Sequence, residues 1–530
     1  MLYLLKDKKK LAASLFMLFG IGLVVYFIAC KERVFFDSDY TDTLIWGQAA
    51  LDGKGVYNSG FWYAYVLPFS GSILMIPFLL LFGVSYTTHI LGMITFSILF
   101  CAALYGCLKQ AGFDYEQRAV LTGLCAILFS VSKTTRMIFW GHVIHYSLGL
   151  LFLWVGLLLF SKLVVGDDFL KDNKQRISLC LLFLWCFLCC NNGFSAVLFF
   201  IIPFVGALLL ERFLDCGIRV NEKANLRVFF ICVGSLISSG IGFLSFYFGQ
   251  RRLSKSYEGY FATIVPSHDW IWEGSDWMRN WVTLSTEVLN HEIPIISFQG
   301  ITILLLFLFS LVLLILPVAA LFSYRKFENR IMRLLLLSHW ILFFVTMFIY
   351  SISPAKGTSW RMCGLFGSSV VISAVYTMWL IKQEKLQRFG YLALCFLTAI
   401  ALLIVLLIVK IPSSYGANRY DRLTQVLKEH DLSYGYGEFW SANVTTILSD
   451  SEVKIRPIVI REDGRYEISH YQSESDWYET QPGISRYFVF LSNYEYECVK
   501  HTLVKDSIKE IPFDENGTIF VFDYNIMEGK

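Results

Sequence analysis

The chain contains a long series of apolar runs, each close to the length that crosses a membrane. A helical span needs about 20 mostly apolar residues to cover the hydrocarbon core of a bilayer. A further apolar run, 66–83, is interrupted by Pro68, Gly71 and Pro77. We therefore expect a polytopic α-helical membrane protein. The predicted spans are 11–30, 86–107, 119–132, 146–163, 177–192, 194–210, 228–248, 298–322, 334–352, 365–381 and 389–410.

The composition argues against a soluble protein. Charged residues make up 16% of the chain and hydrophobic residues 56%, whereas an average globular chain carries about 25% charge. The net charge of +3 is too small for a concentrated nucleic-acid-binding face. Phosphate-loop, dinucleotide-binding and zinc-type spacings are missing from the sequence. We expect no nucleic-acid partner, and no cofactor is indicated, although a divalent metal ion is left open.

Clusters of Lys and Arg indicate the orientation, because cytoplasmic loops are enriched in them. Five clusters lie at 6–10, 171–176, 211–227, 323–333 and 382–388. All five are cytoplasmic if one apolar run of the first third does not cross, and either 66–83 or 119–132 satisfies this condition. Both solutions give about eleven spans with the N-terminus inside. The segments then expected outside are 31–65, 133–145, 249–297, 353–364 and everything after 411.

The character of the sequence changes near residue 411. Apolar runs shorten, and VKIRPIVI, RYFVFL and TIFVFDY are typical of strands. DRLTQVLKEH and YECVKHTL predict short helices. We predict a transmembrane domain over 1–410 and a small extracytoplasmic α/β domain over 411–530.

Three acids follow the first predicted span within the motif DSDYTD: Asp37, Asp39 and Asp42. On a helical turn, Asp39 and Asp42 share a face. A carboxylate beside a low-dielectric boundary holds its proton more tightly than one in water, which suits a general base. The same acids would also serve to begin a helix and keep a loop in water. Which acid would be the base stays open.

Cations in two predicted outer loops run against the inside-positive trend, and an external anion would explain them. Arginine suits a phosphate best, because its planar fork donates two hydrogen bonds. Anchoring at the membrane interface is the alternative for each cation. The candidate phosphate ligands are Arg136, Arg361, Lys133 and Lys356.

Histidines and tryptophans in the same loops are candidates for substrate contacts. His142 and His145 lie at the water end of apolar helices, although an interfacial or core histidine would look the same. Trp272 and Trp277 belong to the run SHDWIWEGSDWMRNW. This run predicts an amphipathic helix in the headgroup layer. Alternatively, it forms a wall that stacks on sugars and closes over a lipid-linked donor.

The acidic motif directly after the first span, the amphipathic stretch that follows, the many spans and the C-terminal outer domain resemble the GT-C superfamily of polyprenyl-phosphate-sugar-dependent glycosyltransferases. The sequence is most similar to the bacterial branch related to protein O-mannosyltransferases and lipid A aminoarabinose transferases. The resemblance covers roughly the first 410 residues as architecture, and at residue level it rests on DSDYTD. The family has two adjacent acids, whereas here Ser38 separates Asp37 from Asp39.

The resemblance implies a GT-C-like membrane glycosyltransferase of the bacterial plasma membrane with its site on the outer face. Its donor would be a polyprenyl-phosphate-linked sugar, and its acceptor an extracytoplasmic glycan, lipid or protein. In that family a first-loop carboxylate takes the proton of the acceptor hydroxyl, and the sugar is transferred with inversion. Asp39 is the leading candidate for this base, with Asp37 and Asp42 beside it.

Two other classes remain as alternatives. A flippase or transporter of lipid-linked glycans would show charges inside its spans, and the predicted spans contain essentially none. A glycan polymerase or ligase of another membrane fold would also use outer cations, but it would not need an acid directly after the first span.

Overall fold

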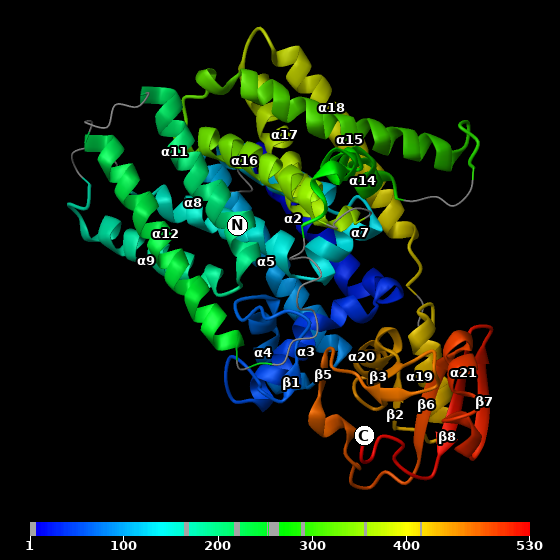
Figure 1. The fold of residues 1–530 in the computed structure, drawn as a ribbon. Helices are drawn as coiled ribbons and strands as arrows, with labels where there is room; N and C mark the ends of the chain where they lie inside the picture. Colours follow the sequence, from blue (N-terminus) through cyan, green and yellow to red (C-terminus); the bar gives the residue numbers. More distant parts are fainter. Residues whose placement is uncertain are drawn as a thin grey trace. The chain divides into compact units, whose positions relative to one another are not determined.

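A computed structural model describes residues 7–163, 169–216, 223–251, 253, 264–287, 292–353, 358–413 and 416–530. It divides the chain into two compact units. The helical unit comprises Met1–Phe27, Phe96–Tyr247 and Gly259–Ile411, and the mixed unit comprises Ile28–Thr95, Phe248–Glu258 and Pro412–Lys530. Figure 1 shows the ribbon, with the sheet of the mixed unit in orange and red.

The described residues contain nine helices that are long and apolar enough to cross a membrane, or ten if one bent pair is a single span. The chain is an integral multi-pass membrane protein. The bent pair is Lys133–Gly141 with His145–Phe160, which meet at 57°. The two apolar runs of which one was expected not to cross both form shorter helices: α6 (Tyr115–Leu128) in place of 119–132, and α4 (Gly71–Phe82) within 66–83. The nine spans are Lys8–Phe35, Tyr86–Gln110, Asn173–Cys190, Phe194–Asp215, Lys223–Gln250, Phe298–Phe322, Arg330–Ile352, Ser359–Lys382 and Gln387–Lys410.

The spans consist of helices with short irregular segments at several ends. The first span joins α2 (Lys8–Tyr26) to a π-helix, η1 (Phe27–Lys31), and a 3₁₀ turn, η2 (Glu32–Phe35). The other helices of this set are α5 (Tyr86–Gln110), α7 (Lys133–Arg136), η4 (Met137–Gly141), α8 (His145–Phe160), α9 (Asn173–Cys190), α10 (Phe194–Ala196), η5 (Val197–Ile201), α11 (Ile202–Cys216), α12 (Lys223–Gln250), α15 (Phe298–Phe322), η7 (Tyr324–Lys326), α16 (Arg330–Ile352), η8 (Ser359–Met362), α17 (Cys363–Lys382) and α18 (Gln387–Lys410).

Helix α17 is the centre of the helical unit. The apolar stretch of the span that contains α17 is 94% buried, whereas the apolar stretches of the other spans are 28–50% buried. It packs against α6, α8, α15, α16 and α18. Small residues on α17, including Gly364, Gly367 and Ser368, let neighbouring helices approach closely, as is common where membrane helices pack.

Two further contacts fix helices of this unit. Helices α2 and α6 meet at Gly20 and Gly123, and a Cβ on Gly123 would lie only 2.8 Å from the carbonyl oxygen of Phe16. The carboxylate of Glu211 on α11 accepts hydrogen bonds from Arg330 and Arg333 on α16, at 2.8–3.1 Å. A buried carboxylate with two guanidinium partners is well compensated.

The C-terminal part of the mixed unit is an α/β structure around a six-stranded sheet, as the sequence predicts. The strand order is β4-β3-β2-β6-β8-β7; β2 is parallel to β3 and β6, and the other pairs are antiparallel. Its elements are α19 (Arg419–Glu429), β2 (Tyr434–Gly437), α20 (Phe439–Leu448), β3 (Lys454–Ile460), β4 (Tyr466–Ile468), η9 (Ser475–Tyr478), β6 (Tyr487–Ser492), α21 (Asn493–Val499), η10 (Val504–Asp506), β7 (Lys509–Asp514) and β8 (Gly517–Phe522).

Alternating residues of the central strand β6 enter two different cores. Tyr487, Val489 and Leu491 belong to one cluster, whereas Phe488 and Phe490 belong to the other. Successive side chains of a strand point to opposite faces, so a strand covered on both faces is apolar throughout. This explains the uninterrupted run YFVFL.

The residues that follow the first span belong to the same unit as this sheet. Arg33 donates to both carboxylate oxygens of Asp421, at 2.6–3.1 Å. The amide of Asn418 donates to the carbonyl oxygens of Arg33 and Phe36, at 2.7 and 2.9 Å. A short ladder also pairs β1 (Phe61–Trp62) with β5 (Ser473–Glu474). The C-terminal region is therefore built around the loop that contains the acidic motif.

Candidate functional site

The acidic motif forms a rigid turn in the mixed unit. Asp37 begins the 3₁₀ turn η3 (Ser38–Thr41), and its carboxylate accepts the backbone N–H of Asp39 at 3.1 Å. The Thr41 hydroxyl donates to the Ser38 carbonyl at 2.6 Å. Helix α3 (Asp42–Asp52) follows directly. The turn leaves Asp37 and Asp39 half-buried, while Asp42 is only 4% exposed.

Residues of the C-terminal region hold this turn in place. The Ser38 hydroxyl donates to the carbonyl oxygen of Phe439 at 2.8 Å. The Asp42 carboxylate accepts a hydrogen bond of 2.6 Å from the side-chain amide of Gln472. Of the three acids, Asp42 is therefore the one that is sequestered, and Asp37 and Asp39 keep access to their surroundings.

A fourth acid, from the C-terminal region, adjoins the residue that accepts the Ser38 hydroxyl. This acid is Glu438, which directly precedes Phe439. Burial raises the pKa of the Glu438 carboxyl to about 7; the negative charge of Glu495 raises it further, and Arg419 lowers it. Burial also raises the pKa of Tyr420 to about 12, with Arg419 opposing and with Glu438 and Asp37 adding negative charge nearby. This corner of the mixed unit therefore contains a carboxyl group that exchanges its proton near neutral pH.

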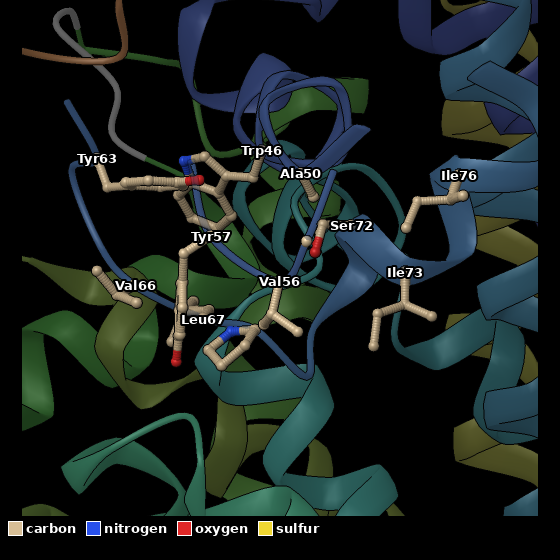
Figure 2. A pocket seen from close by; sticks show the side chains of 12 residues that line it. Trp46, Ala50, Val56, Tyr57, Tyr63, Val66, Leu67, Ser72, Ile73 and Ile76 are labelled. Atoms are coloured by element: carbon tan, nitrogen blue, oxygen red, sulfur yellow. The ribbon is translucent and has the colours of Figure 1, made fainter. Parts of the chain in front are cut away.

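An apolar pocket of about 320 Å³ is lined by residues of α3, of α4 and of the segment between these helices. Figure 2 shows the rings of Trp46, Tyr57 and Tyr63 along one part of its wall and Ile73 and Ile76 along another. Apolar walls with a few polar groups are typical of sites for small or lipidic ligands. Because Trp46 is one turn along α3 from Asp42, the pocket and the acidic motif share one helix.

The helical unit contains the second group of candidates. The Arg136 side chain is only 6% exposed. It donates to the Ser130 carbonyl at 3.0 Å, and its guanidinium lies 5.5 Å from the centre of the Phe27 ring. A carboxylate is already close to it: Glu287 Oε1 lies 4.0 Å from Arg136 and also accepts the backbone N–H of Lys133. The Lys133 side chain itself is exposed.

Helix α14 (Trp277–Thr286) brings several predicted residues into one neighbourhood. It packs against η8, which contains the half-buried Arg361, and against α7, which contains Lys133 and Arg136. Trp277 is half-buried and meets Phe343 edge to face at 6.1 Å. The structure thus gathers Arg136, Lys133, Arg361 and Trp277 around α14, whereas Lys356 lies outside the described residues.

The remaining predicted contacts differ in exposure. Trp272 is on the separate helix α13 (Trp270–Ser275), after the turn η6 (Ser267–Asp269), and is 74% exposed. His142 lies buried at the break between η4 and α8, and His145 begins α8. The tryptophan run is therefore divided between two short helices, and Trp281 is fully buried, donating to the Ser310 carbonyl at 2.9 Å.

The structure also contains charged residues that the sequence reading did not single out. Glu32 and His89 form a fully buried pair at 3.1 Å in the mixed unit. Helices longer than predicted bring Glu32 and Glu211 into the spans Lys8–Phe35 and Phe194–Asp215. Gln472 follows Asp42 by 430 positions, Glu287 follows Arg136 by 151, and Glu438 follows Ser38 of the acidic turn by 400. Because these separations are long and belong to no motif or repeat, no local pattern points to the three residues. Among the described residues, no group of three or more His, Cys, Asp or Glu is arranged to hold a metal ion.

Comparison with known proteins identifies the fold. No family model matches the sequence, and no curated protein is similar to it in sequence. The crystal structure of ArnT from Cupriavidus metallidurans in the apo state aligns with 96% of this chain and 98% of its own, at 11% identity and a TM-score of 0.55. The same ArnT bound to undecaprenyl phosphate aligns over 98% of both chains, at 10% identity and a TM-score of 0.49. The first alignment shows that this chain has the GT-C-like fold of ArnT.

Proposed function

We propose that the protein is an inverting glycosyltransferase that moves a sugar from a polyprenyl-phosphate carrier to an acceptor hydroxyl on the outer face of the membrane. The observation that carries the proposal is the acidic turn directly after the first span of a GT-C-like fold. It offers two half-buried carboxylates on a rigid support. A group held on a fixed element is well suited to proton transfer.

In this reaction the acceptor oxygen attacks the anomeric carbon and the bond from that carbon to the phosphate oxygen breaks. The acceptor proton passes to a carboxylate, for which Asp39 is our first choice. The electron pair of the broken bond leaves with the polyprenyl phosphate. A phosphate leaving group needs cations more than it needs a proton, and this role falls to Arg136 and Arg361, with Lys133 and Lys356 as further candidates.

The pocket beside α3 supports a lipidic substrate. Its volume of about 320 Å³ and its apolar walls suit a segment of an isoprenoid or acyl chain better than a sugar. Filling it with Ala50→Phe should raise KM for the lipid donor severalfold and leave kcat nearly unchanged. An unchanged KM would remove the pocket from the substrate path.

The central experiment measures transfer of a labelled sugar from a polyprenyl-phosphate donor in native membranes. Asp39→Asn should lower the rate by about 10²- to 10⁴-fold, the usual contribution of a general base. The matched control is Asp52→Asn, which changes an exposed acid at the end of α3, the helix that follows the turn; this variant should retain the rate. Loss in Asp37→Asn instead would move the base to that residue. Unchanged transfer with all three acids replaced would overturn the proposal.

A further inference from the structure

Gln472 has an unusual place in the mixed unit. It is fully buried, and its backbone lies in the left-handed region at φ +53°. A non-glycine residue in this region is strained and persists only where its surroundings fix it. Here the surroundings do so, since the Gln472 N–H donates to the Trp62 carbonyl at 2.8 Å and its own carbonyl accepts from Asn443 at 2.9 Å.

The side chain of Gln472 bridges two residues of α3. Its Oε1 accepts the indole N–H of Trp46 at 2.7 Å, and its Nε2 donates to Asp42 at 2.6 Å. The indole nitrogen of tryptophan is only a donor, so the amide oxygen must face Trp46 and the amide N–H must face Asp42. Trp46 therefore fixes the orientation of the amide, and the amide offers Asp42 a proton that favours the carboxylate form.

The segment around Gln472 is also fastened to the loop that follows the motif. β5 pairs with β1, and Asn58 donates to the Glu474 carboxylate at 2.7 Å. Two separate contacts thus hold this segment: Gln472 contacts Asp42, and Glu474 contacts Asn58. Each contact can therefore be removed without the other.

We propose that Gln472 is a positioning residue that holds the Asp42 carboxylate as a fixed anion, so that the C-terminal region completes the acidic turn. The inference rests on the proposed function. A buried anion one turn from Asp39 favours proton transfer to Asp39. The other titratable groups on the surrounding elements are Asp37 and Asp39 on η3, Glu438 before α20, and His470 and Glu474 around β5.

The decisive variant is Gln472→Glu, which keeps the shape and replaces the N–H donor with a second carboxylate. Two carboxylates in contact share a proton. We expect kcat for sugar transfer at pH 8 to fall by about 10- to 100-fold, as for a lost hydrogen bond to a charged group. KM for the donor should change little. The rate should recover as the pH is lowered to 5.5, where the pair binds one proton and restores a hydrogen bond.

The matched control is Asn58→Ala, which loosens the same attachment without touching Gln472. It should lower the unfolding temperature and leave the pH profile of transfer unchanged. Gln472→Glu should change that pH profile, and its unfolding temperature should be lowered more at pH 8 than at pH 5.5. Should Gln472→Glu fail to fold, Trp46→Phe removes the bond that orients the amide and should lower kcat severalfold. Because Trp46 also lines the apolar pocket, kcat and not KM is the readout for this variant.

The outcomes separate the two proposals. A wild-type pH profile and a pH-independent stability loss in Gln472→Glu would overturn the positioning role. Absence of transfer in the wild-type protein, together with the pH-dependent stability of Gln472→Glu, would overturn the proposed glycosyltransferase and keep the coupling between Gln472 and Asp42.

Discussion

The acidic turn of the mixed unit and the cations around α14 in the helical unit hold their charges in different ways. The turn is fixed by neutral partners: Gln472 donates to Asp42, and Ser38 donates to a backbone carbonyl. Arg136 instead lies near an opposite charge, the Glu287 carboxylate, at 4.0 Å. A counter-ion must be displaced before a cation binds another anion, whereas a neutral hydrogen-bond partner such as Gln472 leaves the charge of its acid in place.

The backbone of Glu287 strengthens this contrast. It lies in the left-handed region at φ +62°, at the end of α14. This residue directs its carboxylate at the backbone N–H of Lys133 and at the Arg136 guanidinium, so part of the Arg136 charge is balanced within the helical unit. In the proposed reaction, Glu287 would compete with the donor phosphate for the Arg136 guanidinium.

The largest effect that would sharpen the comparison is expected for Arg136→Ala. If Arg136 binds the donor phosphate as proposed, loss of its buried guanidinium should lower kcat/KM for the lipid donor by about 100-fold, because charge-assisted hydrogen bonds contribute roughly 1.5–3 kcal/mol. Donor titrations in the transfer assay measure this value. Arg461→Ala, an exposed arginine of the mixed unit, is the control, and an equal loss there would contradict a specific role.

Glu287→Gln should have a smaller effect of the opposite sign. Removing the competing carboxylate should lower KM for the donor about two- to fivefold, since a half-exposed ion pair contributes at most about 1 kcal/mol. Binding of a radiolabelled polyprenyl phosphate to the purified protein tests it directly. Weaker binding would mean that Glu287 supports the cations rather than competing for them.

The smallest effect concerns Glu438 beside the acidic turn. Because the folded protein raises the pKa of this carboxyl to about 7, the folded state binds the proton more tightly than the unfolded state. Stability should therefore fall as the pH rises from about 4.5 to 7 and then stay constant. Glu438→Gln removes this penalty and should stabilise the protein at pH 8 by about 1 kcal/mol, after allowing for solvent screening.

The unfolding temperature measured between pH 4.5 and pH 8 checks this prediction. The difference between Glu438→Gln and the wild-type protein should be near zero at the acidic end and should grow toward pH 7. A constant difference across the range would show that the amide acts through packing and not through charge.

Much of the fold could be predicted from the sequence, because it depends on local patterns. Apolar runs predicted most of the spans, and strand patterns such as RYFVFL predicted the β-sheet of the C-terminal region. The predicted number of spans, about eleven, is higher than the nine or ten long apolar helices that the described residues contain. The helix at Tyr115–Leu128 is too short for a crossing by itself, and run length alone does not reveal where a helix begins and ends.

The candidate site was predicted only in its local part. The sequence shows Asp37, Asp39 and Asp42 as a motif, and it shows Arg136 as a cation in a predicted outer loop, against the inside-positive trend. It does not show which other side chains these residues contact. That Asp42 is buried while Asp39 is half-exposed depends on Gln472, which follows it by 430 positions.

The sequence by itself determined the membrane character of the chain, the helical spans and the position of the acidic motif after the first of them, since each follows from hydrophobicity and charge along a short stretch. Only the tertiary structure decided which acids are half-buried, which carboxylate lies near Arg136, and that residues of the C-terminal region contact the acidic turn. These features arise from hydrogen bonds between distant segments, and such bonds leave no periodic trace in the sequence.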